Sequence, residues 1–423
     1  MNKYRTSFKP VEILWDLPSS SSDGGLVLLE KADRRLGLTS RMSACLGPCG
    51  NVRHTWSKML AQRVYGICQG WEDCNDFDRL KDDPLFELAL KDKPASQPTL
   101  CRFENSVNLR QLRRLSLELV RFFIDRHRDN PPRQIVIDMD ATEDPAHGQQ
   151  EFEFYHGFYG SHCFLPLLVF CSVDGADEEL VGAILRPGNV HAGNRSAAIL
   201  RRLARMLKDA FPKAEIVFRA DAGFALPKVY ETCESLGVSY LISLPRNSRL
   251  EKLAAPIMTQ ARTEKENAPD KVRRFGEFQY AADSWTKERR VIVKAEIMTK
   301  GENPRFVVTN RSGDPEALYN EYCLRGDCEN RIKEMKLDLM SGRTSCHRFM
   351  ANAFRLLLHA IAFVLMSEVR RCLAGTGLAR ASLGQIRFKL LKIAALVQAS
   401  TRRILVRLPR GHPHAELIQS LLA

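Results

Sequence analysis

Hydrophobic periodicity separates a helical first third of the chain from a middle part that alternates between strand and helix patterns. Up to residue 130, apolar residues recur every three or four positions, most clearly in the basic stretch 108–127, which predicts amphipathic helices. Residues 135–140 and 150–160 instead alternate between apolar and polar, and residues 163–173 are almost continuously apolar. These three segments are typical of two strands beside a buried one.

The order of the predicted elements indicates the fold class. A helix at 194–211, a strand at 214–221, a helix at 227–236 and a strand at 238–244 follow in turn. Three strands followed by helix, strand, helix and strand is the order of a ribonuclease-H-like α/β domain. The alternation breaks after Arg246, where charged and alternating segments predict a β-rich insertion, and helical periodicity resumes at Pro315.

From these changes of pattern we expect four regions in the chain. They are a mainly helical N-terminal region at 1–130, a ribonuclease-H-like core split into 131–246 and 315–375, a β-rich insertion at 247–314, and a basic C-terminal region at 376–423. The longest apolar run, Leu356–Met366, is interrupted by His359 and is shorter than the roughly 18 residues of a membrane span. We therefore expect a buried helix there and no membrane partner.

The net charge indicates which class of partner the chain binds. The chain has 63 Lys and Arg against 50 Asp and Glu, a formal net charge of +13. Such an excess favours polyanionic partners, nucleic acid first, although many basic proteins bind none. The opening residues are too polar and too soon acidic for a signal peptide, so we expect a cytoplasmic protein, associated with the nucleoid when bound to DNA.

The N-terminal region contains one segment that is typical of a DNA-reading helix. Ser96 is an expected N-cap, and Pro98 follows early in the helix. Gln97, Thr99 and Arg102 then lie at positions that can face phosphates or base edges. An ordinary solvated helix start fits the same residues equally well. With its basic helices, this region is the candidate DNA-binding region.

Three aspartates mark the ends of predicted core strands. Asp138 and Asp140 are two residues apart on one strand and so face the same side of a sheet. Asp221 follows a later strand, directly before a glycine turn. If the two strands are neighbours, two carboxylates converge, and a divalent cation, most naturally Mg²⁺, relieves their repulsion. The alternative for each aspartate alone is that it caps a turn.

A fourth acidic residue lies in a predicted helix with an unusual polar face. If this segment is one helix, Tyr322, Arg325, Glu329 and Lys336 all project from the same side, and Lys333 adds a further cation nearby. One acid among cations and a phenol suits a metal-binding carboxylate flanked by phosphate-binding groups. The alternative is a solvated helix in which arginine and glutamate pair one turn apart.

These residues resemble the DDE transposases of bacterial insertion sequences, in particular the group with a Tyr-Arg-Glu-Lys signature. Further similar segments are 70–84, 98–105, 137–150, 185–194, 218–224 and 343–360, so the resemblance to the group-one transposase DDE domain covers most of the chain. It implies that Asp140, Asp221 and Glu329 are the catalytic and metal-binding triad, with Asp138 as the alternative first acid. It also implies two Mg²⁺ ions, for which Mn²⁺ can substitute.

The resemblance further implies cut-and-paste transposition. Double-stranded DNA would be cleaved at the terminal inverted repeats, and the 3′-OH ends would be transferred into target DNA by a homodimer on paired ends. The signature cations and Tyr322 would hold phosphates, and Trp285 in the insertion is a candidate for stacking on a flipped base, with packing as its alternative. A non-catalytic DNA-binding descendant and a metal-dependent nuclease of the same fold stay open, but the presence of all three acids favours a transposase.

Overall fold

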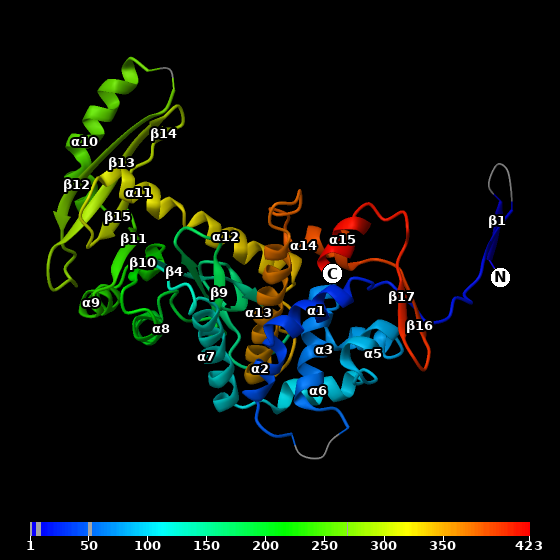
Figure 1. Ribbon diagram of the computed structural model, residues 1–423. Helices are drawn as coiled ribbons and strands as arrows, with labels where there is room; N and C mark the ends of the chain where they lie inside the picture. The colour runs from blue at the N-terminus through cyan, green and yellow to red at the C-terminus, as the bar shows by residue number, and fades with distance from the viewer. Residues whose placement is uncertain (1, 6–9, 50–52, 269) are drawn as a thin grey trace. The chain divides into compact units, whose positions relative to one another are not determined.

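Contacts divide the chain into two compact units, each assembled from segments that are far apart in the sequence (Figure 1). The computed structural model describes residues 2–5, 10–49, 53–268 and 270–423. The first unit comprises Met1–Gln111, Glu334–Arg343 and Ile361–Ala423. The second unit comprises Leu112–Lys333 and Thr344–Ala360, and it contains the predicted catalytic acids.

The second unit is built on a nine-stranded mixed sheet. Its strands are β4 (Gln134–Ala141), β8 (Leu167–Val173), β9 (Glu179–Ile184), β10 (Glu215–Ala220), β11 (Ser239–Leu244), β12 (Val272–Tyr280), β13 (Arg289–Met298), β14 (Gly301–Glu302) and β15 (Arg305–Thr309). They lie in the order β12-β13-β15-β11-β10-β4-β8-β9, with β14 paired to β13. Strand β10 runs parallel to its neighbours β4 and β11, and all other pairs are antiparallel.

Side-chain alternation on these strands separates an apolar face from a face that carries charge. Ile135, Ile137 and Met139 of β4 are buried in the main core cluster, so the intervening Asp138 and Asp140 point to the other face. In the parallel register Met139 lies opposite Ala220, the last residue of β10. The two strands are therefore neighbours, as the convergence of their aspartates requires, and Asp221 follows β10 beside Asp140.

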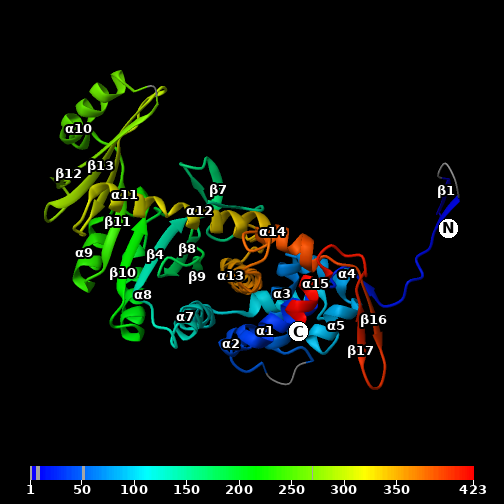
Figure 2. The same cartoon turned by 45° about the horizontal axis from the view of Figure 1, so that its top comes forward.

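Helices cover both faces of this sheet (Figure 2). The core face is covered by α7 (Leu109–Arg126), α8 (Ser196–Ala210), α9 (Pro227–Leu236) and α10 (Ser248–Glu266), and the other face by α11 (Pro315–Cys323) and α12 (Gly326–Lys333). In α8 the buried residues Leu200, Leu203, Ala204 and Leu207 have the three- and four-residue spacing of one helical face. A small sheet, in the order β5-β7-β6, follows β4. Its strands are β5 (Asp144–Pro145), β6 (Phe154–His156) and β7 (Ser161–Phe164).

The segment expected as a β-rich insertion differs from the prediction in its first element. It begins with α10, a helix of 19 residues that the sequence pattern did not indicate. The strands that follow are continuous with the core sheet, because β15 pairs with β11. The buried residues Leu250, Ala254, Met258 and Ala261 do recur at helical spacing, but the many charges between them and the internal Pro256 obscure the pattern.

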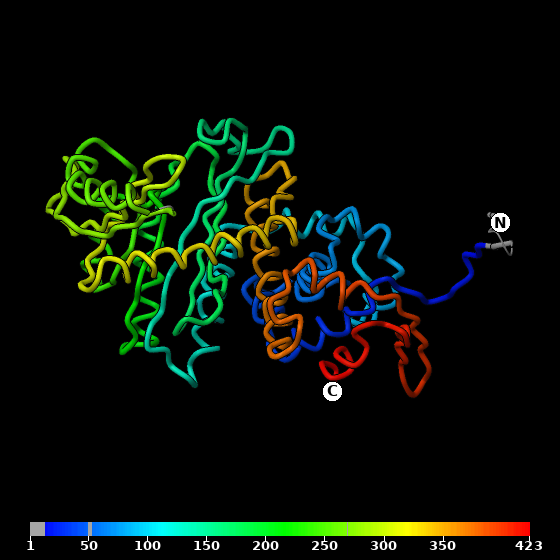
Figure 3. The backbone as a smooth tube through the Cα atoms, turned by 90° about the horizontal axis from the view of Figure 1, so that it is seen from above, coloured from blue at the N-terminus to red at the C-terminus, as the bar shows by residue number. Residues whose placement is uncertain are grey.

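The first unit combines the N-terminal helices with the C-terminal part of the chain (Figure 3). Its helices are α1 (Leu26–Leu36), α2 (Leu38–Ala44), α3 (Trp56–Gln69), α4 (Phe77–Leu80), α5 (Pro84–Leu90), α6 (Gln97–Ser106), α14 (Leu383–Ile386) and α15 (Ala415–Leu422), with 3-10 and π-helical turns at Cys74–Asp76, Glu334–Asp338 and Arg387–Leu391. Its strands are β1 (Asn2–Arg5), β2 (Pro10–Ile13), β3 (Ser20–Ser21), β16 (Ala395–Ala399) and β17 (Ile404–Arg407). The β17-β16-β3 sheet and the hydrogen bond from Arg387 Nε to the Cys68 carbonyl (2.7 Å) join the C-terminal part to the N-terminal part.

The predicted buried helix is α13 (Phe349–Cys372), which contributes residues to both units. Among the described residues it is the one helix long and apolar enough to cross a membrane, but 83% of its most apolar window is buried inside the protein. Even His359 in the middle of the run is fully buried. The burial of Leu356–Met366 confirms the prediction of a core helix.

Candidate active site

Two carboxylates lie together at the carboxyl ends of the adjacent parallel strands β4 and β10. Asp140 is near the end of β4, and Asp221 directly follows β10. Asp221 also caps the short turn Ala222–Phe224, since its Oδ1 accepts a hydrogen bond from the Gly223 amide at 2.9 Å. A Cβ at Gly223 would come within 2.9 Å of the Ala192 Cβ, so the turn requires glycine there. The capping interpretation of Asp221 is confirmed, and its role in a catalytic site stays a prediction.

Arg325 connects two of the three predicted acids. Its Nη2 donates to Asp140 Oδ2 at 2.6 Å, and its Nη1 donates to Glu329 Oε1 at 2.9 Å. Arg325 itself is 7% exposed, whereas the Glu329 side chain is 53% exposed. The arginine–glutamate pair one turn apart is therefore present, and the same guanidinium also neutralises Asp140.

The electrostatics of the site favour cations. Burial raises the pKa of Asp140 to about 6, against the lowering effect of Arg325, and the charge of Asp221 adds to the increase. For Arg325, burial acts to lower the pKa, but the charges of Asp140 and Asp221 outweigh it and raise the pKa above its usual value. A buried carboxyl with an elevated pKa and a second acid beside it gains most from a nearby positive charge.

Asp138 lies on the same face of the sheet but is enclosed. It is fully buried, and Arg219 donates to both of its carboxylate oxygens, at 3.0 and 2.6 Å. The same arginine donates through Nη1 to the carbonyl of Glu321 in α11 at 3.0 Å. Buried Glu178 lies 3.7 Å from Arg219, and burial, followed by the charge of Asp138, raises the pKa of Glu178 to about 9. Asp138 therefore belongs to a buried network beneath the site.

The segment with the predicted signature is not one continuous helix, so the expectation of a single helix is wrong, and the shared polar face stays a prediction. Helix α11 ends at Cys323, α12 begins at Gly326, and a π-helical turn starts at Glu334. Between the helices the amides of Arg325 and Cys328 bond three residues back, which tightens the backbone. Tyr322, which is half-buried, and Lys333, which is exposed, lie in the second unit with the acids, whereas Lys336 belongs to the first unit.

Trp285 packs within an aromatic cluster. Its ring lies 5.0 Å from that of Tyr230 and 5.4 Å from that of Tyr280, both edge to face, and the Arg289 guanidinium lies 5.3 Å from its centroid. These contacts are those of a packing residue in this structure. A stacking role on DNA stays a prediction.

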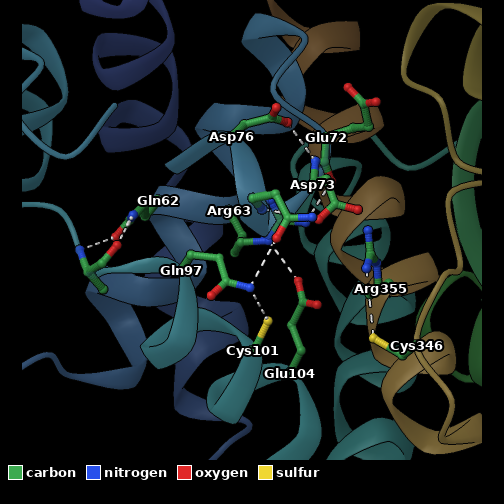
Figure 4. Close-up of polar contacts among 12 residues, drawn as sticks. Gln62, Arg63, Glu72, Asp73, Asp76, Gln97, Cys101, Glu104, Cys346 and Arg355 are labelled. Carbon is green, nitrogen blue, oxygen red and sulfur yellow. Dashed lines mark hydrogen bonds and ion pairs between the residues drawn. The ribbon is translucent and has the colours of Figure 1, made fainter. Parts of the chain in front are cut away.

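The residues of the predicted DNA-reading helix lie at the start of α6. Ser96 is the N-cap residue, but its side chain makes no capping bond. Arg102 Nη2 donates to Thr99 Oγ1 at 3.2 Å, and both side chains reach solvent. Gln97 donates instead to Asn75 Oδ1 (3.0 Å) and to Cys101 Sγ (3.3 Å), so its amide is engaged within the unit (Figure 4).

One residue near the acids escaped the sequence analysis. Burial, followed by the charges of Asp140 and Glu143, raises the pKa of Tyr159, so this phenol lies close to the carboxylates. Its neighbour Phe158 is 85% exposed, and the two rings meet edge to face at 5.0 Å. The alternating pattern of 150–160 indicated a strand. It gave no sign that the turn of this hairpin returns to the end of β4.

The carboxylates fit a divalent cation in chemistry. Asp140 and Asp221 offer hard oxygen ligands on adjacent strand ends, and a bound cation would offset the cost of burying the charged form of Asp140 beside Asp221. Within the described ranges, however, no three His, Cys, Asp or Glu side chains are grouped closely enough to hold a metal ion. The Glu329 carboxylate accepts a hydrogen bond from Arg325, so its side chain would have to change orientation to bind a metal.

The chain belongs to the family described as transposase DDE domain group 1, whose model matches residues 7–423. Among solved structures, it is similar to a piggyBac transposase synaptic complex with hairpin DNA, at 12% identity and a TM-score of 0.40 over 88% of this chain and 79% of that chain. A Mos1 transposase paired-end complex with left transposon end matches at 14% identity and a TM-score of 0.18, over 45% of this chain and 63% of that chain. No curated protein matches the chain.

Proposed function

We propose that the chain cuts double-stranded DNA at the terminal inverted repeats of an insertion sequence and transfers the 3′-OH ends into target DNA. Asp140, Asp221 and Glu329 are the catalytic residues of this proposal. The observation that carries it is the position of Asp140 and Asp221 at adjacent parallel strand ends, on the face covered by the turn with Arg325 and Glu329. Membership of a transposase family supports the reaction class.

The sheet order supports a ribonuclease-H-like core within the proposal. Strands β9, β8, β4, β10 and β11 are adjacent in that order, with the first three antiparallel and the last three parallel. Carboxylates at the ends of the central strands of an open α/β sheet lie where such sheets keep their sites. The three antiparallel strands beyond β11 are then the continuation of the sheet by the insertion.

Asp140, Asp221 and Glu329 are the residues that would hold Mg²⁺, with Mn²⁺ as a substitute. When bound, two such ions activate the attacking hydroxyl and stabilise the leaving oxygen of an in-line displacement. Glu329 would exchange its bond to Arg325 for the metal, and its exposure gives it room to do so. Arg325 would keep its contact with Asp140 and direct its remaining donors to a DNA phosphate.

Asp140 is our choice for the first acid because of what surrounds Asp138. The two oxygens of Asp138 are already occupied by Arg219, and the side chain has no access to solvent. A metal ligand there would have to displace a buried guanidinium, at a large electrostatic cost. Asp138 is better suited to positioning β4 and β10 against each other.

The remaining residues of the proposal bind DNA. Tyr322, Lys333 and Lys336 would hold phosphates together with Arg325, and Trp285 would stack on a flipped base. Gln97, Thr99 and Arg102 would contact the element end. The net charge of +13 supports a polyanionic partner, and binding should weaken steeply with salt. Two copies on paired ends, acting in the cytoplasm at the nucleoid, complete the proposal.

An excision assay in cells tests this function. A donor plasmid would carry a marker between the two DNA segments that flank the chain's own coding sequence, and the chain would be supplied separately. We expect excision of the marker, its reintegration elsewhere, and loss of both with Glu329→Gln. Broken donor DNA without joined products would indicate a nuclease of the same fold instead. Binding of the segments without any breakage would indicate a DNA-binding descendant.

A further inference from the structure

A cavity of about 630 Å³ in the first unit has an aromatic wall. It is lined by residues of α3 and α6 and of the loops beside them. Trp56, Met59 and Phe103 form the apolar part of its lining, and the rings of Trp56 and Phe103 are stacked at 5.3 Å with an angle of 27° between their planes. Nε1 of Trp56 is shielded from solvent and has no hydrogen-bond partner among the described residues.

Four cationic side chains line this cavity. Arg53, Lys81, Lys93 and Arg102 line it and are exposed, against the single acid Asp82. In the part of the chain that the structure describes, none of these four cations forms an ion pair. The cavity therefore presents net positive charge next to an aromatic surface.

The start of α6 adds hydrogen-bond donors to the same lining. The Ser96 hydroxyl does not cap the helix and instead bonds to Thr99 Oγ1 at 3.1 Å, which in turn accepts from Arg102 at 3.2 Å. Two hydroxyls and a guanidinium thus meet at the first turn of a ten-residue helix. Helix N-termini favour negative charge, so this end of the cavity suits a phosphate.

Buried polar contacts hold the walls of the cavity in place (Figure 4). Fully buried Arg63 of α3 donates to Glu104 of α6 at 2.7 Å and to the Glu72 carbonyl at 2.7 Å. Gln62 of α3 exchanges two hydrogen bonds with the backbone of Ala95, at 2.9 and 2.8 Å. A cavity between helices fixed in this way does not have to be ordered when a ligand enters it, which favours binding.

We propose that this cavity binds one unstacked nucleotide of the DNA substrate, with its base against Trp56 and its phosphate at Arg102 and Lys93. In a duplex the faces of the bases are covered by their neighbours, so an aromatic wall serves only a base that has left the stack. The cavity volume lies within the roughly 300–1,000 Å³ of small-molecule sites. The inference rests on the proposed function in taking DNA as the substrate.

Binding of the full chain to three probes tests the inference. The probes are a blunt duplex, the same duplex with a single-stranded tail that contains a fluorescent adenine analogue, and free dAMP. We expect the parent to prefer the tailed duplex and to quench its fluorophore. Trp56→Leu should reduce the preference about tenfold and abolish the quenching, because base stacking is lost. Arg102→Ala should lower the salt dependence of tailed-duplex binding by about one phosphate contact.

The test includes a matched control and two variants of exposed cavity residues. Arg34→Ala removes an arginine of the same unit whose side chain is 68% exposed and lies outside the cavity, and it should change none of these values. If Trp56→Leu fails to fold, the exposed Arg102→Ala and Lys93→Ala still report on the cavity. Normal tailed-duplex binding in all the cavity variants would overturn the inference, and so would an equal loss for blunt and tailed DNA.

Three further outcomes distinguish the inference from the proposed function on which it rests. Binding of dAMP as tight as that of the tailed duplex would identify a free nucleotide as the ligand and overturn the DNA assignment. Tailed-duplex preference that depends on Trp56 in a chain that never cleaves DNA would support the cavity and contradict the transposase proposal. Normal excision by Trp56→Leu, together with no preference of the parent for the tailed duplex, would support the transposase proposal and contradict the cavity inference.

Discussion

Arg325 Nη2 donates to Asp140 Oδ2 at 2.6 Å, although the two residues are 185 positions apart in the sequence. The bond ties the turn between α11 and α12 to the end of β4. It also places a buried positive charge beside a carboxylate that would be a metal ligand in the proposed reaction. Both the ionisation of Asp140 and the orientation of Glu329 depend on this one guanidinium.

Replacing Arg325 should shift the pH dependence of DNA cleavage. The pKa of Asp140 is about 6 with the lowering effect of Arg325 already included, so Arg325→Met leaves Asp140 protonated to a higher pH. We expect the acidic limb of the cleavage–pH profile to move upward by about one unit or more. Arg325→Lys keeps the charge and should move the limb less. An unchanged limb in Arg325→Met would show that Asp140 does not control the rate.

Asp138→Asn should lower the free energy of unfolding, and not only the rate of cleavage. The substitution removes the carboxylate that accepts two hydrogen bonds from Arg219, which is 4% exposed, and breaking a buried pair costs about 3–5 kcal/mol. Urea unfolding would measure this loss, with Asp140→Asn as the matched control. We expect the control to lose much less stability, because it removes a carboxyl whose charged form is disfavoured by burial. Equal losses would contradict the different environments of the two aspartates.

Glu178 should make stability depend on pH. Its pKa in the folded state is about 9, above the usual 4.5, so the folded protein holds a proton that the unfolded chain releases between these values. The free energy of unfolding therefore falls as pH rises through that range. Glu178→Gln should flatten this dependence and should be more stable than the parent near pH 9, at the upper end of the range. Melting temperatures across the range would check it, and an unaltered slope in the variant would refute it.

The arrangement of the buried aspartates shows what the sequence could predict. Periodicity located β4 and β10 and the acids at their ends, because strand alternation is a local property. The distinction between Asp138 and Asp140 depends on register, since Arg219 lies directly opposite Asp138 on the parallel neighbour. Two residues further on, Asp221 follows at the level of Asp140 without a compensating charge on β10. Matching Arg219 of β10 with Asp138 of β4 by charge would have indicated this register.

Other features depend on tertiary packing and left no local signal. The break between α11 and α12 joins two stretches that are each helical in pattern, so periodicity alone predicts one helix. Tyr159 reaches the acids because of how a hairpin returns to β4. Helix α10 is stabilised by burial of four residues on the sheet edge, which outweighs its charged composition. The four region boundaries stay predictions, although α7 packs on the sheet of the second unit.

The Arg63–Glu104 pair offers a test of how α6 is held. Both side chains are at most 1% exposed, so Glu104→Ala removes the carboxylate that compensates a buried guanidinium and should cost about 3–5 kcal/mol of unfolding free energy. The double variant Arg63→Met with Glu104→Leu removes both charges and should lose less than the single one. Urea unfolding of the three proteins measures the difference. A double variant less stable than Glu104→Ala would show that the pair itself stabilises the unit.

Cleavage and strand joining on a labelled duplex that carries the element end, with Mg²⁺, tests the central claim most directly. The parent would be compared with Asp140→Asn, Asp221→Asn, Glu329→Gln and Asp138→Asn, each first shown to be folded. We predict metal-dependent cleavage in the parent, its loss in the first three variants, and residual cleavage in folded Asp138→Asn. Loss with Asp138→Asn but not with Asp140→Asn, or cleavage that survives Glu329→Gln, would contradict the assignment of the site.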